Sequence, residues 1–448
     1  FFSRVFFHTT ISTMSSKRKN VDSDDAKQVD ANKKHKTVCD EKFRYSKAKP
    51  VPMLAGAPLL TGVSYPFGLE WTKEAHETVL TLNSKLLPGS SKIAAFDMDS
   101  TLITTKSGKT FPTGAADWTW WDAKVVPMLR NYWQNGYKIV IFTNQAGIEK
   151  KKTNPEEIKT KILALCKALD FPLVAFAAAG TNNWRKPHSE MWHYLVRHAN
   201  KDVCVDLQNC VYVGDAAGRD KGWKPGAKKD FGCGDRKFAW NCGIPFQTPE
   251  EFFLGHKSVP FQWRTADPAK LLHMAEEIQL FEGSSITKPS PEVVLFCGSP
   301  AVGKSTFAHT HLIPNGYVWV NRDTLKTPKK CLVAAEAALA QGKSVVVDNT
   351  SPKPADRAPY IAAAKKAGVP VRAFVFAVSR EIAAHLNFYR EHQSQGTRRR
   401  VPDVAFHTYN KNAQAPATSE GLSEVCTVNF KPAFDNEEEK AFFLEWTE

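Results

Sequence analysis

Apolar residues along this chain gather into short runs that alternate with amphipathic stretches of helical periodicity. Four runs have the length and composition of buried strands, and the stretches between them have the spacing of helices. The strand-like runs are 93–96, 138–142, 173–177 and 211–213, and the helical stretches lie near 123–135, 155–169 and 187–199. Strands that alternate with helices in this way predict a parallel sheet covered by helices.

A second series of the same kind follows later in the chain. Its strand-like runs are 293–296, 317–320, 344–347 and 371–376. Residues 256–291, between the two series, hold scattered Pro, Ser and Gly around one short helical segment at 268–281, which is typical of a linker. The pattern therefore predicts an α/β protein with two doubly wound parallel-sheet domains, at 48–255 and 292–448.

Residues 1–47 are polar and poor in apolar side chains, which predicts a disordered tail. Lys17-Arg18-Lys19 and Lys33-Lys34-His35-Lys36 flank an acidic spacer in the layout of a bipartite nuclear import signal, although short basic runs are also common in disordered tails. Residues 1–13 resemble either part of a mitochondrial presequence or sequence translated upstream of a start at Met14. We expect a nuclear protein, with mitochondrial localisation in addition if the presequence interpretation holds.

Charge and cysteine content narrow the function further. The formal net charge is +14, and residues 1–47 contribute 11 Lys and Arg against 6 Asp and Glu, so the remainder still carries +9. A basic folded body suits a polyanionic partner such as nucleic acid, and a generic solubility charge is the alternative.

Nine cysteines without a C-x-x-C pair indicate free thiols and no zinc site. No apolar run reaches transmembrane length, so we expect a soluble protein without membrane contact.

Two carboxylates directly follow the first strand-like run, in Asp97-Met98-Asp99-Ser100-Thr101. Ligands of open α/β sheets bind at the carboxyl ends of the strands. Hydrolysis of a phosphomonoester needs a nucleophile, a proton donor for the leaving alkoxide and positive charge around the phosphoryl oxygens. The turn after the strand allows Asp99 to reach over a substrate that Asp97 attacks.

The later strands of this first series supply the remaining groups in order. Thr143-Asn144-Gln145 ends one strand with a hydroxyl and an amide, Arg185-Lys186-Pro187 provides a cation before a helix, and Gly214-Asp215 ends another strand with an acid. Taken singly, Lys186 reads as a solvated lysine and Gly214-Asp215 as a turn. Four such pieces at successive strand ends favour a phosphatase site.

These residues resemble the haloacid dehalogenase superfamily, whose members fold as a doubly wound sheet. The resemblance implies that Asp97 is the nucleophile and forms an aspartyl-phosphate, with Asp99 as general acid and base. It also implies that Thr143 and Lys186 bind the phosphoryl group, and that Asp97, the Asp99 carbonyl and Asp215 hold Mg²⁺.

The second series opens on a glycine-rich phosphate-binding pattern, Gly-x4-Gly-Lys-Ser, directly after strand 293–296. Its glycines let the backbone amides surround phosphates, its lysine reaches the β and γ oxygens, and its serine ligates Mg²⁺. The pattern predicts an ATP-binding P-loop. The nucleotide-binding candidates are Gly298, Ser299, Pro300, Ala301, Val302, Gly303, Lys304, Ser305 and Thr306.

Residues at the next strand ends complete a kinase site. Asp323 follows the strand 317–320 and is placed to accept the proton of an attacking hydroxyl, with a helix N-cap as the alternative. Asp348 ends the following strand, where an acid contacts Mg²⁺. Arg390, or an arginine of the run Arg398-Arg399-Arg400, is expected to close over the transferred phosphoryl group, although a solvated basic face explains that run equally well.

The two sites in this order resemble the family of bifunctional polynucleotide kinase 3′-phosphatases, from about Tyr45 to Phe430. The matching runs extend beyond the generic motifs: Phe142-Thr143-Asn144-Gln145-Ala146-Gly147-Ile148, Tyr212-Val213-Gly214-Asp215-Ala216-Ala217-Gly218-Arg219, Asn321-Arg322-Asp323-Thr324 and Asp348-Asn349-Thr350. Animal members carry an N-terminal forkhead-associated domain, which the tail does not resemble, so recruitment through that module is not implied.

Two further departures from the family pattern concern single residues. The family places two arginines after Asp-Asn-Thr, whereas this chain has Arg357 and then Pro359, so nucleotide contacts of the second arginine are not carried over. Asp220 is an extra acid without an assigned role.

The resemblance implies a monomeric enzyme that heals broken or nicked DNA, using Mg²⁺ and ATP and acting beside ligase or scaffold partners. It would remove 3′-phosphates and phosphorylate 5′-hydroxyls. The alternatives are a phosphatase/kinase for RNA or small molecules, and a binding scaffold with inactive domains. Tryptophan rings can stack on unpaired nucleic-acid bases, and the chain has them in Trp118-x-Trp120-Trp121 and at Trp184. Trp184 is the first candidate for such a contact. The alternative is that these rings are core residues.

Overall fold

The computed structural model describes residues 66–447 apart from 74, 395 and 396. The tail with its import signal and presequence lies outside these residues. None of the described helices combines the length and the apolar character that crossing a membrane requires.

The first sheet has seven strands in the order β1-β2-β7-β6-β3-β8-β9. Strands β3, β6, β7, β8 and β9 run parallel, while β1 and β2 are antiparallel additions beside β7. A separate hairpin, β4 (Ile103–Thr104) with β5 (Thr119–Trp120), follows β3. The sheet strands are β1 (Glu70–Thr72), β2 (Val79–Asn83), β3 (Ile93–Phe96), β6 (Lys138–Asn144), β7 (Val174–Ala178), β8 (Val211–Val213) and β9 (Phe246–Gln247).

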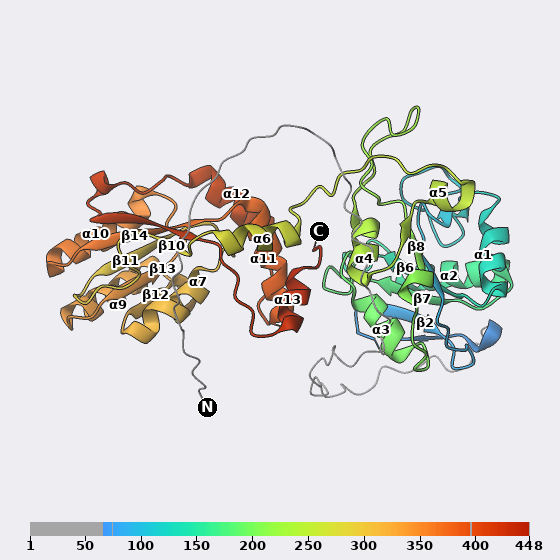
Figure 1. Ribbon diagram of the computed structural model, residues 1–448, viewed down its shortest axis with the longest axis horizontal. Coiled ribbons are helices and arrows are strands. Elements are labelled where there is room, and N and C mark those ends of the chain that lie inside the picture. The colour runs from blue at the N-terminus through green and yellow to red at the C-terminus, as the bar shows by residue number, and fades with distance from the viewer. Residues whose placement is uncertain (1–65, 74, 395–396, 448) are drawn as a thin grey trace, which may run out of the picture. The chain divides into compact units, whose positions relative to one another are not determined.

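Helices cover both faces of this sheet (Figure 1). Successive residues of a strand point to opposite faces. Ala94 and Phe96 therefore enter one core with α1 (Val125–Gln134), α2 (Pro155–Leu169) and α5 (Pro249–Leu254). Ile93 and Ala95 enter the other core, which is completed by α3 (Glu190–His198) and α4 (Gly234–Cys242). Burial on both faces explains why β3 is an uninterrupted apolar run.

Helix α2 illustrates how the local sequence sets the limits of an element. The Asn154 side chain accepts a hydrogen bond from the Glu156 amide, and Pro155 occupies the first turn, where its missing amide hydrogen costs nothing. The helix ends at Asp170, which adopts a left-handed backbone conformation with φ of 60°. These signals explain why a helix near 155–169 was predictable.

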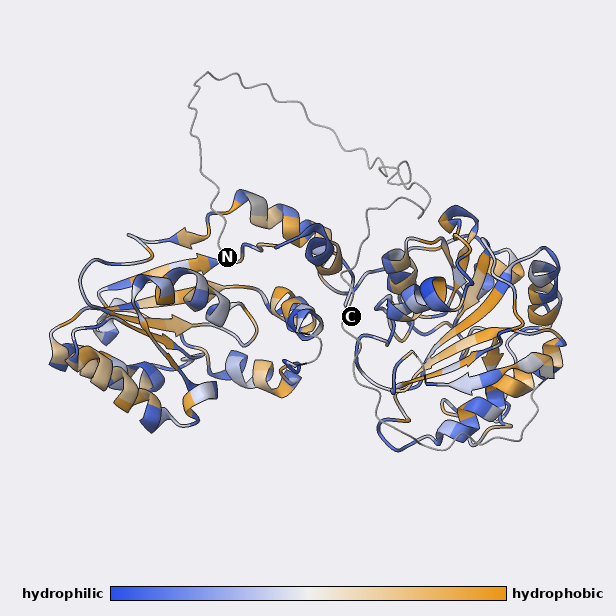
Figure 2. Ribbon diagram, turned by 90° about the horizontal axis from the view of Figure 1, so that it is seen from below, coloured by the Kyte–Doolittle hydropathy of each residue, from blue (hydrophilic) through white to orange (hydrophobic). Residues whose placement is uncertain are grey.

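The second sheet has six strands in the order β10-β15-β14-β11-β13-β12. Strands β11 to β15 pair in parallel, and β10 joins the edge antiparallel to β15. Figure 2 shows the strands of both sheets as predominantly hydrophobic ribbon. The strands are β10 (Phe281–Glu282), β11 (Val293–Cys297), β12 (Val318–Asn321), β13 (Val345–Asp348), β14 (Val371–Ala377) and β15 (Glu424–Asn429).

Alternation along β11 again divides the core between two faces. Val293 and Leu295 pack with α9 (Pro328–Ala340) and α10 (Pro354–Ala367). Val294 and Phe296 pack with α7 (Lys304–Phe307), α11 (Arg380–Gln393) and α12 (Asp403–Asn412). The remaining helices are α6 (Pro268–Glu277), α8 (Arg322–Leu325) and α13 (Glu437–Phe443).

The prediction of two doubly wound α/β sheets is confirmed, with three additions at the sheet edges. Strands β1 and β2 were not predicted, and both are antiparallel. Strand β10 lies inside the stretch 256–291 that was expected to be linker, yet it pairs with β15. A strand of two residues carries no periodic signal, and its partner lies about 146 residues away in the chain.

The expectation of free thiols is confirmed for seven cysteines of the described residues. They are buried free thiols, at 166, 210, 233, 242, 297, 331 and 426.

A buried ion pair anchors the beginning of β14 to the segment before β11. Both Arg372 and Glu292 are almost completely buried, at 2% and 0% exposure, and the Arg372 Nε atom donates to Glu292 Oε2 at 2.7 Å. The Tyr317 hydroxyl also donates to Glu292, and Arg372 donates to the carbonyl oxygens of Ser285 and Ile286. The pair is thus fully hydrogen-bonded, which is the condition for keeping a charge inside a protein.

We predict that Arg372→Met lowers the free energy of unfolding of this second domain by about 3–5 kcal/mol, because it leaves the Glu292 carboxylate buried and unpaired. The measurement is the midpoint of urea-induced loss of the activity carried by this domain, with the other activity as internal reference. The double variant Arg372→Met/Glu292→Met should recover much of the loss. No recovery would mean that the packing of Arg372, and not its charge, is what matters.

Candidate active sites

The first site is built around Asp97, which lies directly after β3 at the carboxyl edge of the sheet. Its amide donates to the Val213 carbonyl at 2.9 Å, so the backbones of two neighbouring strands hold it in place. The residue is 8% exposed. Burial raises the pKa of Asp97 to about 7, while the neighbouring Lys186 lowers it and Asp235 and Asp99 raise it. The carboxylate therefore depends on nearby positive charge to remain ionised at neutral pH.

Lys186 supplies that charge through direct contact with Asp97. Its Nζ atom donates to Asp97 Oδ1, Asp235 Oδ1 and the Tyr212 hydroxyl, each at 2.7 Å. Burial on its own disfavours the ammonium, but Asp235 and Asp97 together raise the pKa of Lys186 above its usual value. Asn144 fixes the lysine backbone through a reciprocal pair of hydrogen bonds at 3.1 and 3.0 Å. The ammonium is thus held with all three donors occupied.

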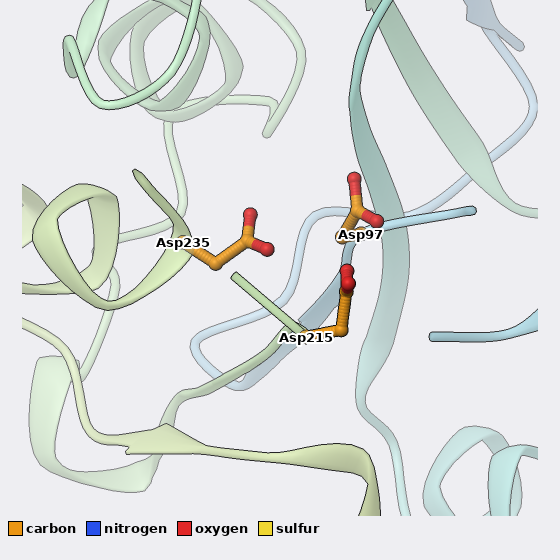
Figure 3. Close-up of side chains that lie close together, drawn as sticks. All are labelled: Asp97, Asp215 and Asp235. Atoms are coloured by element: carbon orange, nitrogen blue, oxygen red, sulfur yellow. The ribbon is translucent and has the colours of Figure 1, made fainter. Parts of the chain in front are cut away.

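Three carboxylates converge at this point, from three elements of the fold. Asp97 follows β3, Asp215 follows β8 and Asp235 lies in the first turn of α4, and Figure 3 shows the three side chains close together. One oxygen of each lies within 4.8 Å of the others. Burial raises the pKa of Asp215 well above its usual value, and Asp97 and Asp235 raise it further.

This cluster has an excess of negative charge, because three acids face one lysine. Hard carboxylate oxygens in such an arrangement suit Mg²⁺. The expected metal ligands Asp97 and Asp215 are therefore brought together. Asp235 is already used by three hydrogen bonds, from Lys186, the Tyr212 hydroxyl and the Ala216 amide at 2.7, 3.0 and 2.9 Å. We interpret it as the residue that positions Lys186.

Asp99 and Thr143 are linked by an amide that the sequence analysis did not assign. The Gln145 Nε2 atom donates to Asp99 Oδ2 at 2.8 Å and to the Thr143 hydroxyl at 3.0 Å. Asp99 is exposed, whereas Thr143 is 1% exposed. Asp99 is thus open to solvent, and Ser100, with φ of 64°, turns the chain after it. An exposed carboxyl group beside Asp97 is a candidate proton donor for a leaving oxygen.

The second site is the loop between β11 and α7. Ala301 and Gly303 have φ of 62° and 89°, which curls the backbone so that successive amides converge, as in an anion-binding nest. The Lys304 Nζ atom donates to the carbonyls of Gly298 and Ser299 at 3.1 and 2.5 Å. Burial lowers the pKa of Lys304 to about 8, although Asp348 raises it, so the ammonium predominates at neutral pH.

Asp348 lies at the end of β13 and connects this loop to the neighbouring strand. Its Oδ2 atom accepts from the Ser305 hydroxyl at 2.6 Å, from Trp319 Nε1 at 3.0 Å and from Asn321 Nδ2 at 3.1 Å. A hydroxyl beside a buried carboxylate is the donor set with which P-loops hold Mg²⁺. The structure therefore brings the expected metal residues Ser305 and Asp348 together.

Asp323 and Arg390 lie close enough to Lys304 for each to change the pKa of that lysine, Asp323 upward and Arg390 downward. Asp323 is exposed in α8, and the cap of this helix is Asn321, whose side chain accepts from the Thr324 amide at 3.1 Å. The N-cap interpretation of Asp323 is therefore wrong. The Nε atom of Arg390 is buried without a hydrogen-bond partner, so it retains a donor for an anion.

Other candidates from the sequence have structural roles. Arg357 is fully buried and pairs with both carboxylate oxygens of Glu420, at 2.8 and 2.7 Å. Arg400 pairs with Glu391 at 2.6 Å. The tryptophans at 118, 120 and 121 pack against one core of the first sheet, and Trp184 packs against the other core, between His76 and Tyr194. These contacts favour the core interpretation of all four rings over base stacking.

Comparisons with known proteins agree with this geometry. Residues 92–253 match the family model described as polynucleotide kinase 3 phosphatase, and residues 293–416 match that of an AAA domain. A bifunctional polynucleotide phosphatase/kinase of Schizosaccharomyces pombe is 40% identical over 80% of this chain and 85% of its own. A putative enzyme of the same description from Acanthamoeba polyphaga mimivirus is 33% identical over 80% of this chain and 90% of its own.

We predict that Asp235→Asn lowers the phosphatase kcat by about 10- to 100-fold, as loss of a residue that supports a primary ligand does. The amide keeps the shape of the side chain but removes one of the two negative charges that hold Lys186. The kinase activity of the same preparation should not change, which controls for folding. Tyr212→Phe removes an uncharged partner of Lys186 and should cost less. An equal loss in both variants would argue against a charge-based role for Asp235.

Proposed function

The chain belongs to the family of bifunctional polynucleotide phosphatase/kinase enzymes, and from this membership we propose that its two sites heal broken or nicked DNA. One site removes a 3′-phosphate and the other adds a 5′-phosphate, which produces ends that a ligase can seal. The observation that carries this proposal is the presence of two sites of opposite chemistry on one chain, each with its charged groups converging at the carboxyl edge of a sheet. A binding scaffold has no use for either set.

Removal of the 3′-phosphate proceeds in two steps. The Asp97 carboxylate attacks phosphorus, the bond to the 3′ oxygen breaks, and Asp99 gives its proton to that oxygen. Water then attacks the aspartyl-phosphate while Asp99 takes back a proton, and inorganic phosphate leaves. Thr143 and Lys186 hold the phosphoryl oxygens, and Lys186 does so by exchanging its bond to Asp97 Oδ1 for a phosphoryl oxygen. Mg²⁺ held by Asp97, the Asp99 carbonyl and Asp215 would supply further positive charge for the phosphoryl group.

Addition of the 5′-phosphate is a direct transfer from ATP. The backbone of the P-loop, residues 298–306, surrounds the phosphates, and Lys304 exchanges its bonds to loop carbonyls for the β and γ oxygens. Asp323 accepts the proton of the 5′-hydroxyl as that oxygen bonds to the γ-phosphorus and ADP leaves. Arg390 offers its donors to the transferred group, and Mg²⁺ at Ser305 and Asp348 would neutralise developing charge.

We predict that the two activities separate by mutation. Asp97→Asn should lower 3′-phosphate release roughly 10⁴-fold or more, because an amide is a poor nucleophile, and leave 5′-phosphorylation intact. Lys304→Ala should lower 5′-phosphorylation roughly 10²- to 10³-fold and leave the phosphatase intact. Both rates are measured with Mg²⁺ on nicked, gapped and single-stranded oligonucleotides of DNA and of RNA.

A folded single variant that loses both activities would contradict two independent sites. Equal or better turnover of RNA would contradict the choice of DNA, and it would leave the assignment of the two reactions unaffected. Omitting Mg²⁺ should abolish both reactions, and adding it back should restore them.

The basic clusters of the tail lead us to propose nuclear localisation. We predict that deleting residues 1–40 leaves both reactions unchanged in vitro and reduces nuclear accumulation, since this segment has two basic clusters and lacks a core-forming pattern. Fluorescence microscopy of tagged full-length and truncated proteins measures the distribution. A second variant with Lys17, Arg18 and Lys19 changed to Gln separates the effect of charge from that of length. A truncated protein that folds without activity would contradict a targeting role.

A further inference from the structure

The segment between β8 and α4 contains a loop of unusual charge. Residues 221–229 hold four lysines and no acid, and Lys221, Lys224, Lys228 and Lys229 are all exposed. We call residues 219–230 the lysine loop. Figure 1 shows the lime-green segment that follows β8 extending away from the sheet. Neither proposed reaction uses any of its side chains.

The lysine loop is closed at its base and near its tip. At the base, the Arg219 amide and Nε atom donate to Asp230 Oδ2 at 2.9 and 2.8 Å, and the Asp230 amide donates to the Arg219 carbonyl at 3.0 Å. Near the tip, the Gly222 amide donates to the Ala227 carbonyl at 3.0 Å. Trp223 bridges the two arms through its Nε1 atom, which donates to the Lys228 carbonyl at 3.2 Å. These bonds reduce the freedom that an irregular loop of this length otherwise has.

The base of the lysine loop is attached to the phosphatase site. Arg219 donates to the carbonyl of Asp215, the candidate metal ligand, at 3.4 Å, and to Glu250 at 2.8 Å. Gly218 lies close to the neighbouring backbone, because a Cβ atom there would lie 2.4 Å from the Gln262 carbonyl oxygen, and its own carbonyl accepts from the Gln262 amide at 2.9 Å. Asp220, the acid without an assigned role, pairs with Arg264 at 3.6 Å beside this base. The lysines therefore lie on a loop whose hydrogen-bonded base begins at Arg219, four residues after Asp215.

The acids near the lysine loop leave most of its charge uncompensated. Asp230 is used by Arg219, and Lys224 pairs with Glu250 at 3.2 Å. Within the part of the chain that the structure describes, no carboxylate forms an ion pair with Lys221, Lys228 or Lys229. Trp223 is not free to stack on a base, because Arg219 and Lys224 lie over its ring at 3.8 and 4.6 Å. The loop thus offers mainly uncompensated positive charge.

We propose that the lysine loop binds the phosphodiester backbone of the strand whose 3′ end occupies the phosphatase site. The ammonium of lysine is a flexible point charge that contacts phosphates of any sequence, which is what an enzyme for arbitrary broken ends requires. A charge that serves only solubility has no need of a closed loop attached to the metal ligand. This inference rests on the proposed function, because it takes a polynucleotide as the substrate.

The test is the full-length triple variant K221Q/K228Q/K229Q, which keeps the Lys224 pair with Glu250. Its kcat/KM on a 3′-phosphorylated single-stranded oligonucleotide should fall roughly tenfold at about 50 mM salt, relative to its kcat/KM on p-nitrophenyl phosphate. The slope of log kcat/KM against log salt should also become shallower by about 2, since each lost contact to a single strand removes about 0.7.

The matched control is K85Q/K92Q/K201Q, which removes the same charge from the same domain. These lysines are exposed. Lys85 lies near the start of β7, Lys92 directly before β3 and Lys201 before β8, so all three are at the edge of the sheet opposite Asp97. The control should retain the wild-type salt slope. Equal changes in both variants, or none in either, would overturn the proposal. A wild type that hydrolyses the small ester but not the oligonucleotide would instead contradict the proposed function.

Discussion

A charge that is buried at the carboxyl edge of a sheet must be balanced by groups in direct contact with it. The arrangement of both sites in this chain follows from that requirement. The cost of removing an isolated ion from water is several kcal/mol even after relaxation. In the phosphatase half, the Lys186 ammonium is held by two carboxylates and a phenol, so removing any of these partners changes the state of the others. In the kinase half, Lys304 is held by the carbonyl oxygens of its own loop.

The two sites resolve this requirement in opposite ways, and the difference matches their chemistry. The phosphatase site has more acid than base, because three carboxylates face one lysine, and burial raises the pKa of Asp97 to about 7. The P-loop has no covalent step to perform, and its lysine needs only to exchange neutral carbonyl oxygens for phosphate oxygens. Under the proposed mechanism, the phosphatase half supplies a nucleophile, whereas the kinase half binds ATP and positions it for direct transfer.

Substrate contact and chemistry are carried by different kinds of structure in the phosphatase half. The reacting groups follow buried strands, where backbone hydrogen bonds limit their movement, as between Asp97 and Val213. The lysine loop is exposed to solvent, but its base is attached to Asp215 through Arg219. With the two tasks on separate structures, the site can position the phosphoryl group precisely and still accept nucleic-acid strands of any sequence.

The sequence alone determined the two α/β sheets, the order of the two sites and the residues that follow their strands, because apolar runs mark buried strands and ligand-binding groups lie where those strands end. It did not indicate Asp235, which lies on a helix 49 residues after Lys186 and follows no strand. It also left Asp323 open between proton acceptor and helix cap, and Trp184 open between base stacking and core packing. Only the tertiary structure brought Asp235 to Lys186, gave the helix cap to Asn321 instead of Asp323, and packed Trp184 against His76 and Tyr194. The partners of Asp235 and of His76 lie far away in the chain, so no local pattern of residues reveals these contacts.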